Sequence, residues 1–117
     1  MPYLESLAPI RYSTALSDAI RYIEKRYADN FQMEELAAHL SLSVFRLHHL
    51  FQKELSTTPI KYRNKCRIEH AAKDLRSADI PMKQIAERND FHSVTYFREI
   101  FKEYTGMTPM QYMETLA

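Results

Sequence analysis

Basic residues gather in the middle of the chain. Between Val44 and Arg67 there are six Lys and Arg residues and one acidic residue, Glu54, although the whole chain has a net charge of only +1. The six are Arg46, Lys53, Lys61, Arg63, Lys65 and Arg67, with His48 and His49 among them. Such a concentration of positive charge is typical of a surface that binds a polyanion, but an ordinary solvated helix face would look the same.

The segment after Ser43 carries side chains suited to contact the edges of nucleic-acid bases. Its apolar residues recur at helical spacing and would form a buried stripe: Val44, Leu47, Leu50 and Phe51. The side chains left outside are the candidates for base contacts: Phe45, Arg46, His48 and His49. A Phe can meet a thymine methyl group, and Arg or His can donate to base or phosphate acceptors. The alternatives are that Phe45 folds over the edge of the core or contacts another protein, and that the Arg and His side chains have no partner.

A second segment, after Ser93, has the same form. Its candidates for base contacts are Thr95 and Arg98. For both segments we expect contacts to a phosphate backbone from Ser43, Lys53, Lys61, Arg63, His92, Ser93 and Lys102. The two serines could equally be plain helix caps. Glu99 could accept from cytosine or pair with a neighbouring cation, and because acidic residues offset the cations here we expect the first segment to bind more strongly.

Catalytic and metal-binding patterns are weak. The chain has no Ser-His-Asp order, Gly-rich loop or paired carboxylates that stand out from chance. Cys66 and His70 are four residues apart, but a structural zinc site needs four ligands, so we expect Cys66 to be a small core residue. We therefore predict that the protein is not an enzyme and has no catalytic residue, cofactor or metal.

Composition favours a small helical protein. At 117 residues and 13.9 kDa the chain has room for one domain or two very small ones. A chain with a single Gly is poorly suited to form β-hairpins. Its single Cys excludes an internal disulfide and fits a reducing cytosol. No apolar run approaches the roughly 20 residues that span a bilayer. We expect a cytoplasmic protein that does not contact membranes.

Helical periodicity predicts an all-α fold of about seven helices and no strands. Ser13 or Thr14 can cap the start of the first helix. Gln32 and Glu35 have the spacing of a capping box at the second. The longest is expected from Ile60 to about Arg76. The others are expected at 34–39, after Ser43, at 82–88, after Ser93 and at 110–116.

An internal repeat is the strongest signal. The stretch that starts at Leu36 matches the stretch that starts at Ile85, with an offset of 49 residues before the turn and 50 after it. Each copy has a short helix with an Ala, a tight turn, a longer helix after a Ser, and a Thr-Pro pair that starts the next helix. This is the plan of a helix-turn-helix, present twice.

With these residues in view, the chain resembles the DNA-binding region of the AraC/XylS family of bacterial transcription regulators over about residues 15–114. The matching residues are Leu36, Ala37, Ser43, Leu47, Leu50, Phe51, Pro59, Tyr62, Arg67, Ala71, Ala72, Leu75, Ile85, Ala86, Phe91, Ser93, Tyr96, Phe97, Phe101, Lys102, Gly106, Thr108, Pro109 and Tyr112. The resemblance implies two homeodomain-like helix-turn-helix subdomains joined by a long central helix. Asp90 and Ser56 stand where the family usually has Gly, and Glu99 where a basic or polar residue is common.

On this basis we divide the chain into an N-terminal extension (1–12), a first subdomain (13–59), a linker helix (60–76) and a second subdomain (77–117). We expect Arg67 to tie the subdomains together. The expected function is sequence-specific binding of double-stranded DNA by a transcription activator, with two helices in adjacent major-groove segments, as a monomer that also contacts RNA polymerase at the bacterial nucleoid.

Two alternatives stay open. The chain could be a helical protein-interaction module, because it has six Met residues and outward aromatic side chains. It could also be the excised DNA-binding tail of a larger effector-responsive regulator rather than a short regulator without an effector domain.

Overall fold

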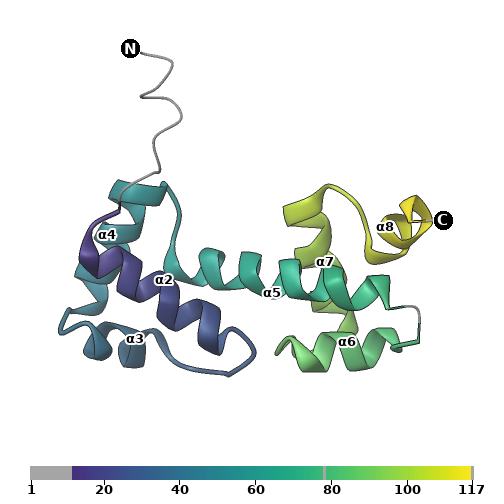
Figure 1. Ribbon diagram of the computed structural model, residues 1–117, viewed down its shortest axis with the longest axis horizontal. Helices are drawn as coiled ribbons and strands as arrows, with labels where there is room; N and C mark the ends of the chain where they lie inside the picture. The colour runs from purple at the N-terminus through teal and green to yellow at the C-terminus, as the bar shows by residue number, and fades with distance from the viewer. Residues whose placement is uncertain (1–11, 78, 117) are drawn as a thin grey trace, which may run out of the picture.

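The computed structural model describes residues 12–77 and 79–116, so nearly all of the expected N-terminal extension lies outside the described residues. Within that part there are seven helices and no strand, which confirms the all-α prediction (Figure 1). They are α2 (Thr14–Arg26), α3 (Met33–His39), α4 (Val44–Leu55), α5 (Pro59–Arg76), α6 (Met82–Arg88), α7 (Val94–Thr105) and α8 (Pro109–Thr115). None of these helices has both the length and the hydropathy to cross a membrane.

Hydroxyl side chains start most of the helices. Each accepts a hydrogen bond from the backbone N–H three residues later, which satisfies a donor that the helix leaves free. The caps are Ser13, Ser43, Thr58, Ser93 and Thr108. Gln32 precedes α3 but makes no such bond, so the capping box expected there is wrong, because the longer Gln side chain is not among those that fit the cap position. A capping box forms instead at Thr108 and Gln111.

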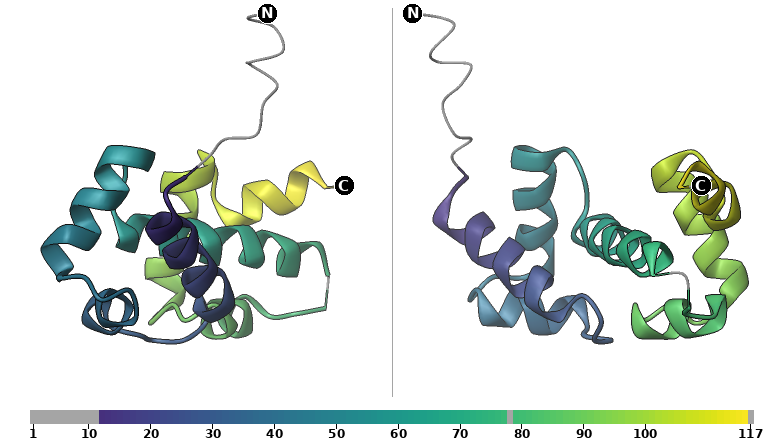
Figure 2. Two further views of the ribbon diagram at one scale, coloured as in Figure 1. Left: turned by 60° about the vertical axis from the view of Figure 1, so that its left-hand side comes forward. Right: turned by 45° about the vertical axis from the view of Figure 1, so that its right-hand side comes forward.

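Two hydrophobic clusters form the core, one at each end of α5. The first gathers buried side chains of α2, α3 and α4 with the segment before α3: Leu16, Ala19, Ile23, Phe31, Met33, Leu36, Ala37, Leu47 and Phe51, joined by Cys66 of α5. The second gathers Ile68, Ala71 and Leu75 of α5 with Ile85, Ala86, Phe91, Phe97 and Phe101. Figures 1 and 2 show α5 running from one group of helices to the other. The molecule is flat, with extents of 41 × 41 × 20 Å.

The repeat extends to the backbone conformation. The turns after α3 and α6 contain Ser41 (φ 57°) and Asp90 (φ 60°) at equivalent positions. The ends of α4 and α7 contain Ser56 (φ 54°) and Gly106 (φ 81°), again equivalent. Ser56 and Asp90 therefore adopt the left-handed conformation that Gly, usual in the family at both positions, takes without strain.

The side chain of Cys66 is buried, and its thiol is poorly suited to react with reagents in solution. Burial raises the pKa of its thiol to about 11, so at neutral pH the thiol stays protonated. Among the described residues no three His, Cys, Asp or Glu side chains are grouped closely enough to hold a metal ion. Cys66 is thus a core residue, as expected.

We predict that thiol–disulfide exchange of Cys66 with dithiobis(nitrobenzoate), which forms a mixed disulfide and releases thionitrobenzoate, requires unfolding. At pH 8 the native protein should react with a thiol reagent at least about 100-fold more slowly than the protein in concentrated urea, because the thiol is neither accessible nor ionised. The measurement is the rate of release of thionitrobenzoate. A native rate equal to the rate in urea would contradict this burial.

Candidate nucleic-acid interface

The first helix-turn-helix consists of α3, a turn at 40–43 and α4. Ala37 of α3 is 1% exposed, and its carbonyl accepts a 2.9 Å hydrogen bond from the N–H of Leu42. In the second, Ala86 of α6 is 1% exposed and accepts a 2.9 Å bond from Phe91 N–H. A small side chain lets the two helices of each unit cross closely, and the same turn bond sets how the second helix leaves the first. The two units therefore share one local geometry.

The outer face of α4 presents an aromatic side chain among basic side chains and histidines. Phe45 is 80% exposed, so it does not fold over the core edge. Arg46, His49 and Lys53 are also exposed, and His48 is partly exposed. These side chains form the expected contact face of the first unit, which we call the α4 face.

Two hollows flank the α4 face. A hollow of about 670 Å³ is bounded by Phe45, Arg46, His49 and Lys53 on one side and by Ser13 and Ala15 of α2 on the other. A second, of about 290 Å³, lies toward Thr58 and is also lined by Phe45 and His49. Phe45 and His49 thus line both hollows. Exposed side chains with open space beside them can enter a groove of a duplex.

The outer face of α7 is polar and has less net positive charge. Thr95, Arg98, Glu99 and Lys102 are exposed, as are His92 and Ser93 just before the helix. Within the described residues Glu99 forms no ion pair with either neighbouring cation, so the pairing weighed for Glu99 is absent. Its carboxylate offsets part of the positive charge of this α7 face.

Ser43 and Ser93 use their hydroxyl oxygens as helix caps. They accept bonds of 3.1 Å from Arg46 N–H and 3.0 Å from Tyr96 N–H. Each hydroxyl proton remains able to donate to a phosphate. Lys61 lies exposed in the first turn of α5, where its carbonyl accepts a bond from Tyr104 Oη at 2.8 Å. The expected phosphate contacts of these residues stay predictions.

Arg63 is only partly exposed, unlike the other residues expected to contact phosphates. Its Nη1 donates to the carbonyl of Phe31 at 2.7 Å, and its guanidinium carbon lies 4.9 Å from the centre of the Phe31 ring. Burial lowers the pKa of Arg63, and its Nε is buried without a partner. Arg63 thus holds the segment before α3 against α5. These contacts do not test the phosphate contact expected of Arg63, which stays a prediction.

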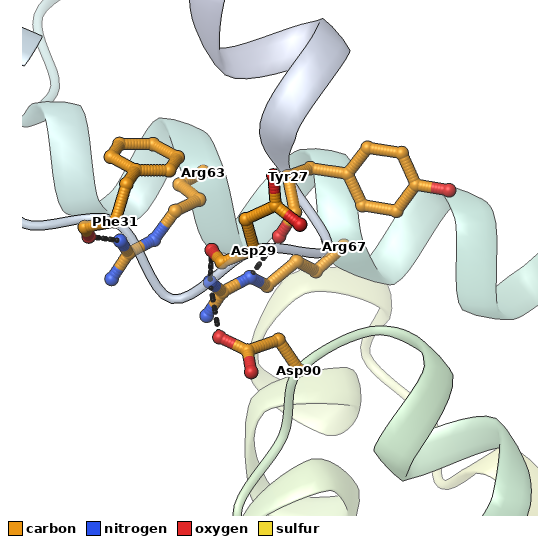
Figure 3. A network of polar contacts seen from close by, with 6 residues as sticks. All are labelled: Tyr27, Asp29, Phe31, Arg63, Arg67 and Asp90. Atoms are coloured by element: carbon orange, nitrogen blue, oxygen red, sulfur yellow. Dashed lines mark hydrogen bonds and ion pairs between the residues drawn. The ribbon is translucent and has the colours of Figure 1, made fainter.

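Arg67 connects the two units, which confirms the prediction made for it (Figure 3). From α5 it donates to the carbonyls of Tyr27 and Asp29, at 2.6 and 3.1 Å, in the segment that leads from α2 into the first unit. Its Nη2 also forms a 2.8 Å ion pair with Asp90 in the turn of the second unit. Burial and nearby Arg63 lower the pKa of Arg67 to about 10, against the opposing effect of Asp90, so its charge persists at neutral pH.

Sequence reasoning missed a contact between α2 and α4. Glu54 accepts hydrogen bonds from Ser13 N–H at 2.8 Å and from Ser13 Oγ at 2.6 Å, and these bonds lower the pKa of the Glu54 carboxyl. They attach the start of α2 to the last turn of α4. The one available signal was that Glu54 is the lone acidic residue in the basic segment.

Asn89 was also missed. It is 1% exposed, and its Nδ2 donates to Asp74 Oδ2 at 3.0 Å and to the Ile85 carbonyl at 2.8 Å. A buried amide of this kind fixes the turn after α6 on α5, since breaking its bonds would leave polar atoms without partners. Periodicity offered no signal for it, because a polar residue in a turn is expected to be exposed.

The chain matches known proteins over most of its length. Residues 36–115 match the family model described as a helix-turn-helix domain. The chain is 37% identical over 101 residues to the uncharacterized HTH-type transcriptional regulator YijO of Escherichia coli, covering 86% of this chain and 36% of that protein. It is 32% identical over 109 residues to the arabinose operon regulatory protein of E. coli, covering 92% of this chain and 37% of that protein. It thus spans little more than a third of the length of these relatives.

A solved structure agrees with the sequence relatives. The C-terminal domain of AraT, a response regulator from Geobacillus stearothermophilus, superimposes with a TM-score of 0.83 at 33% identity, covering 91% of this chain and 88% of that one. The match includes both helix-turn-helix units and the helix between them. The chain therefore belongs to the AraC/XylS family of transcription regulators, of which it is the DNA-binding region.

Proposed function

We propose that this region binds an asymmetric DNA site as a monomer, with α4 and α7 in two successive major-groove segments. The observation that carries the proposal is the repetition of one arrangement: two capped helices follow turns that share the same backbone hydrogen bond, and each presents a face of exposed side chains. Successive segments on one side of a duplex lie about 34 Å apart. The molecule is 41 Å long in two directions, which is enough to reach both.

The residues proposed to contact bases are the exposed side chains of the two faces. On α4 they are Phe45, Arg46, His48 and His49, and on α7 they are Thr95 and Arg98. The residues proposed to contact phosphates are Ser43, Lys53, Lys61, Arg63, His92, Ser93 and Lys102. The α4 face carries more positive charge than the α7 face, where Glu99 opposes Arg98, so α4 should supply more of the binding free energy.

Activation of transcription is proposed for the regulator that contains this region, with RNA polymerase as the protein partner, in the bacterial cytoplasm. The relatives that support this are bacterial transcriptional regulators. A non-enzymatic role is part of the same proposal. Two assays would test the proposed activation of transcription. One measures transcription in vitro from a template that carries the selected site, and the other measures crosslinking of the bound protein to RNA polymerase.

A selection from randomised duplexes tests the DNA-binding proposal. Duplexes retained at about 0.15 M salt should share an asymmetric motif with two blocks about ten base pairs apart. Arg46→Ala should remove the preference at one block. Arg21→Ala changes an exposed Arg on α2 that lines neither hollow beside the α4 face, and it should leave the motif unchanged. A palindrome occupied by two chains would refute monomeric binding, and a single enriched block would refute base contacts by α7.

A second candidate function is protein interaction through α8. This helix exposes Met110 (63%) and Met113 (38%), and Leu116 just after it is 47% exposed. A group of exposed apolar side chains can mark a surface that binds another protein. Protein interaction through α8 is compatible with DNA binding by α4 and α7. If it were the sole function, the selection would retain no motif at all and binding to duplexes would be weak and strongly dependent on salt.

A further inference from the structure

A single buried guanidinium lies between the two helix-turn-helix units. The side chain of Arg67 is 6% exposed and that of its partner Asp90 is 27% exposed. Two of its hydrogen bonds go to backbone carbonyls that follow α2, and one goes to the turn between α6 and α7 (Figure 3). Arg67 therefore joins the first unit, the linker helix and the second unit at one point.

The turn that contains Asp90 and the end of α6 before it are held at one further point on α5, the carboxylate of Asp74. Asn89 donates to Asp74 at 3.0 Å, and Arg88 forms an ion pair with the same carboxylate at 3.5 Å. Helix α7 begins at Val94, four residues after Asp90. Because the turn sets how α7 leaves α6, the position of Asp90 relative to the first unit is coupled to the direction of α7.

The chemistry of this bridge suits orientation better than stabilisation. The free energy needed to remove a guanidinium and a carboxylate from water offsets much of the attraction between them. Such pairs therefore add little to the free energy of unfolding compared with apolar contacts. Directed bonds from one planar group to three acceptors do, however, fix the angle between the parts that carry the acceptors. Without such a contact, small units joined by one helix move relative to each other.

We propose that Arg67 and Asp90 are positioning residues that fix the angle between the two helix-turn-helix units and thereby set the spacing of the two DNA segments that α4 and α7 can occupy. The inference rests on the proposed function for its DNA part. The orientation itself is a property of the free protein and is tested without DNA.

Asp90→Gly is the informative variant, with Ser41→Gly as its matched control. Both residues lie at the same position of their turns with φ near 60°, which Gly adopts without strain, so neither change should disturb the backbone. Only Asp90→Gly removes a bridge to the other unit. Thermal unfolding of both variants verifies that the fold is retained.

The first measurement is the distance between spin labels in the free protein. Labels at Glu34→Cys in α3 and Gln84→Cys in α6, both exposed positions, report on the two units in a Cys66→Ala background. The distance distribution by double electron–electron resonance should be about twofold broader in Asp90→Gly and unchanged in Ser41→Gly. Equal widths in all three proteins would overturn the proposal.

The second measurement varies the spacing of the two selected blocks. One base pair inserted between them should weaken binding of the parent protein about tenfold, since a rigid pair of units cannot follow the change. Asp90→Gly should bind the original site about tenfold more weakly than the parent protein does. Its affinity should fall less than about threefold when the base pair is inserted. A duplex with the α4 block alone should be bound equally by all variants. An unchanged spacing dependence in Asp90→Gly would also overturn the proposal.

The two measurements separate the two hypotheses. If the parent protein binds one block only, the two-segment function and the DNA part of this inference are refuted together. In that case the distance distributions still decide whether Arg67 and Asp90 orient the units.

Discussion

Phe97→Ala is expected to lower the free energy of unfolding by about 3–5 kcal/mol, as is typical when a buried aromatic side chain is removed. Phe97 is fully buried in the second cluster, with its ring centre 5.1 Å from that of Phe91 and 5.7 Å from that of Phe101. The change leaves a cavity that the surrounding helices can fill only in part. Urea unfolding followed by circular dichroism measures the effect.

The matched control is Phe45→Ala, which removes the same side chain from an 80% exposed position of α4. It should change the free energy of unfolding by no more than about 0.5 kcal/mol, because the ring has few contacts to lose. A similar loss from both variants would contradict the placement of Phe45 outside the core.

The two hydrophobic clusters make the damage local. Phe97 belongs to the cluster that contains α6 and α7, while the cluster of α2, α3 and α4 does not include it. In Phe97→Ala, amide hydrogens of α6 and α7 should therefore exchange sooner than those of α2 and α4. Uniform loss of protection throughout the chain would show that α5 couples the two clusters into one cooperative unit.

Local signals in the sequence predicted the helices well, because both the caps and the apolar periodicity act within one or two turns. Ser43 and Ser93 start α4 and α7 as expected, and Val44, Leu47, Leu50 and Phe51 all face inward or are partly covered. The outward direction of Phe45 followed from the same periodicity, since a helix with one apolar stripe leaves the residues between its members exposed.

The long-range polar contacts were harder to predict. Arg63 was placed among the phosphate contacts because it is a cation in a basic segment, yet it bonds to the carbonyl of Phe31, 32 residues away. A long flexible side chain can turn either way from its helix, and only the neighbouring backbone decides which. The bond between Ser13 and Glu54, 41 residues apart, was missed for the same reason.

The interface of α4 leads to the second large prediction. Phe45→Ala should weaken binding to the selected duplex about ten- to a hundredfold, because burying a Phe side chain contributes about 1.5–3 kcal/mol. Binding to unrelated duplexes should hardly change, since that binding depends on phosphate contacts. Fluorescence anisotropy at constant salt measures both affinities, and the stability comparison above excludes unfolding as the cause.

A cycle of two changes tests which base group Phe45 contacts. Replacing a contacted thymine by uracil removes one methyl group, which is worth about 0.8 kcal/mol or about fourfold in affinity. The loss should appear at one thymine of the α4 block with the parent protein and vanish with Phe45→Ala, because the methyl group then has no ring to contact. If every thymine shows the same loss with both proteins, Phe45 does not contact a methyl group, and base recognition by the first unit depends on Arg46 and the two histidines of the α4 face.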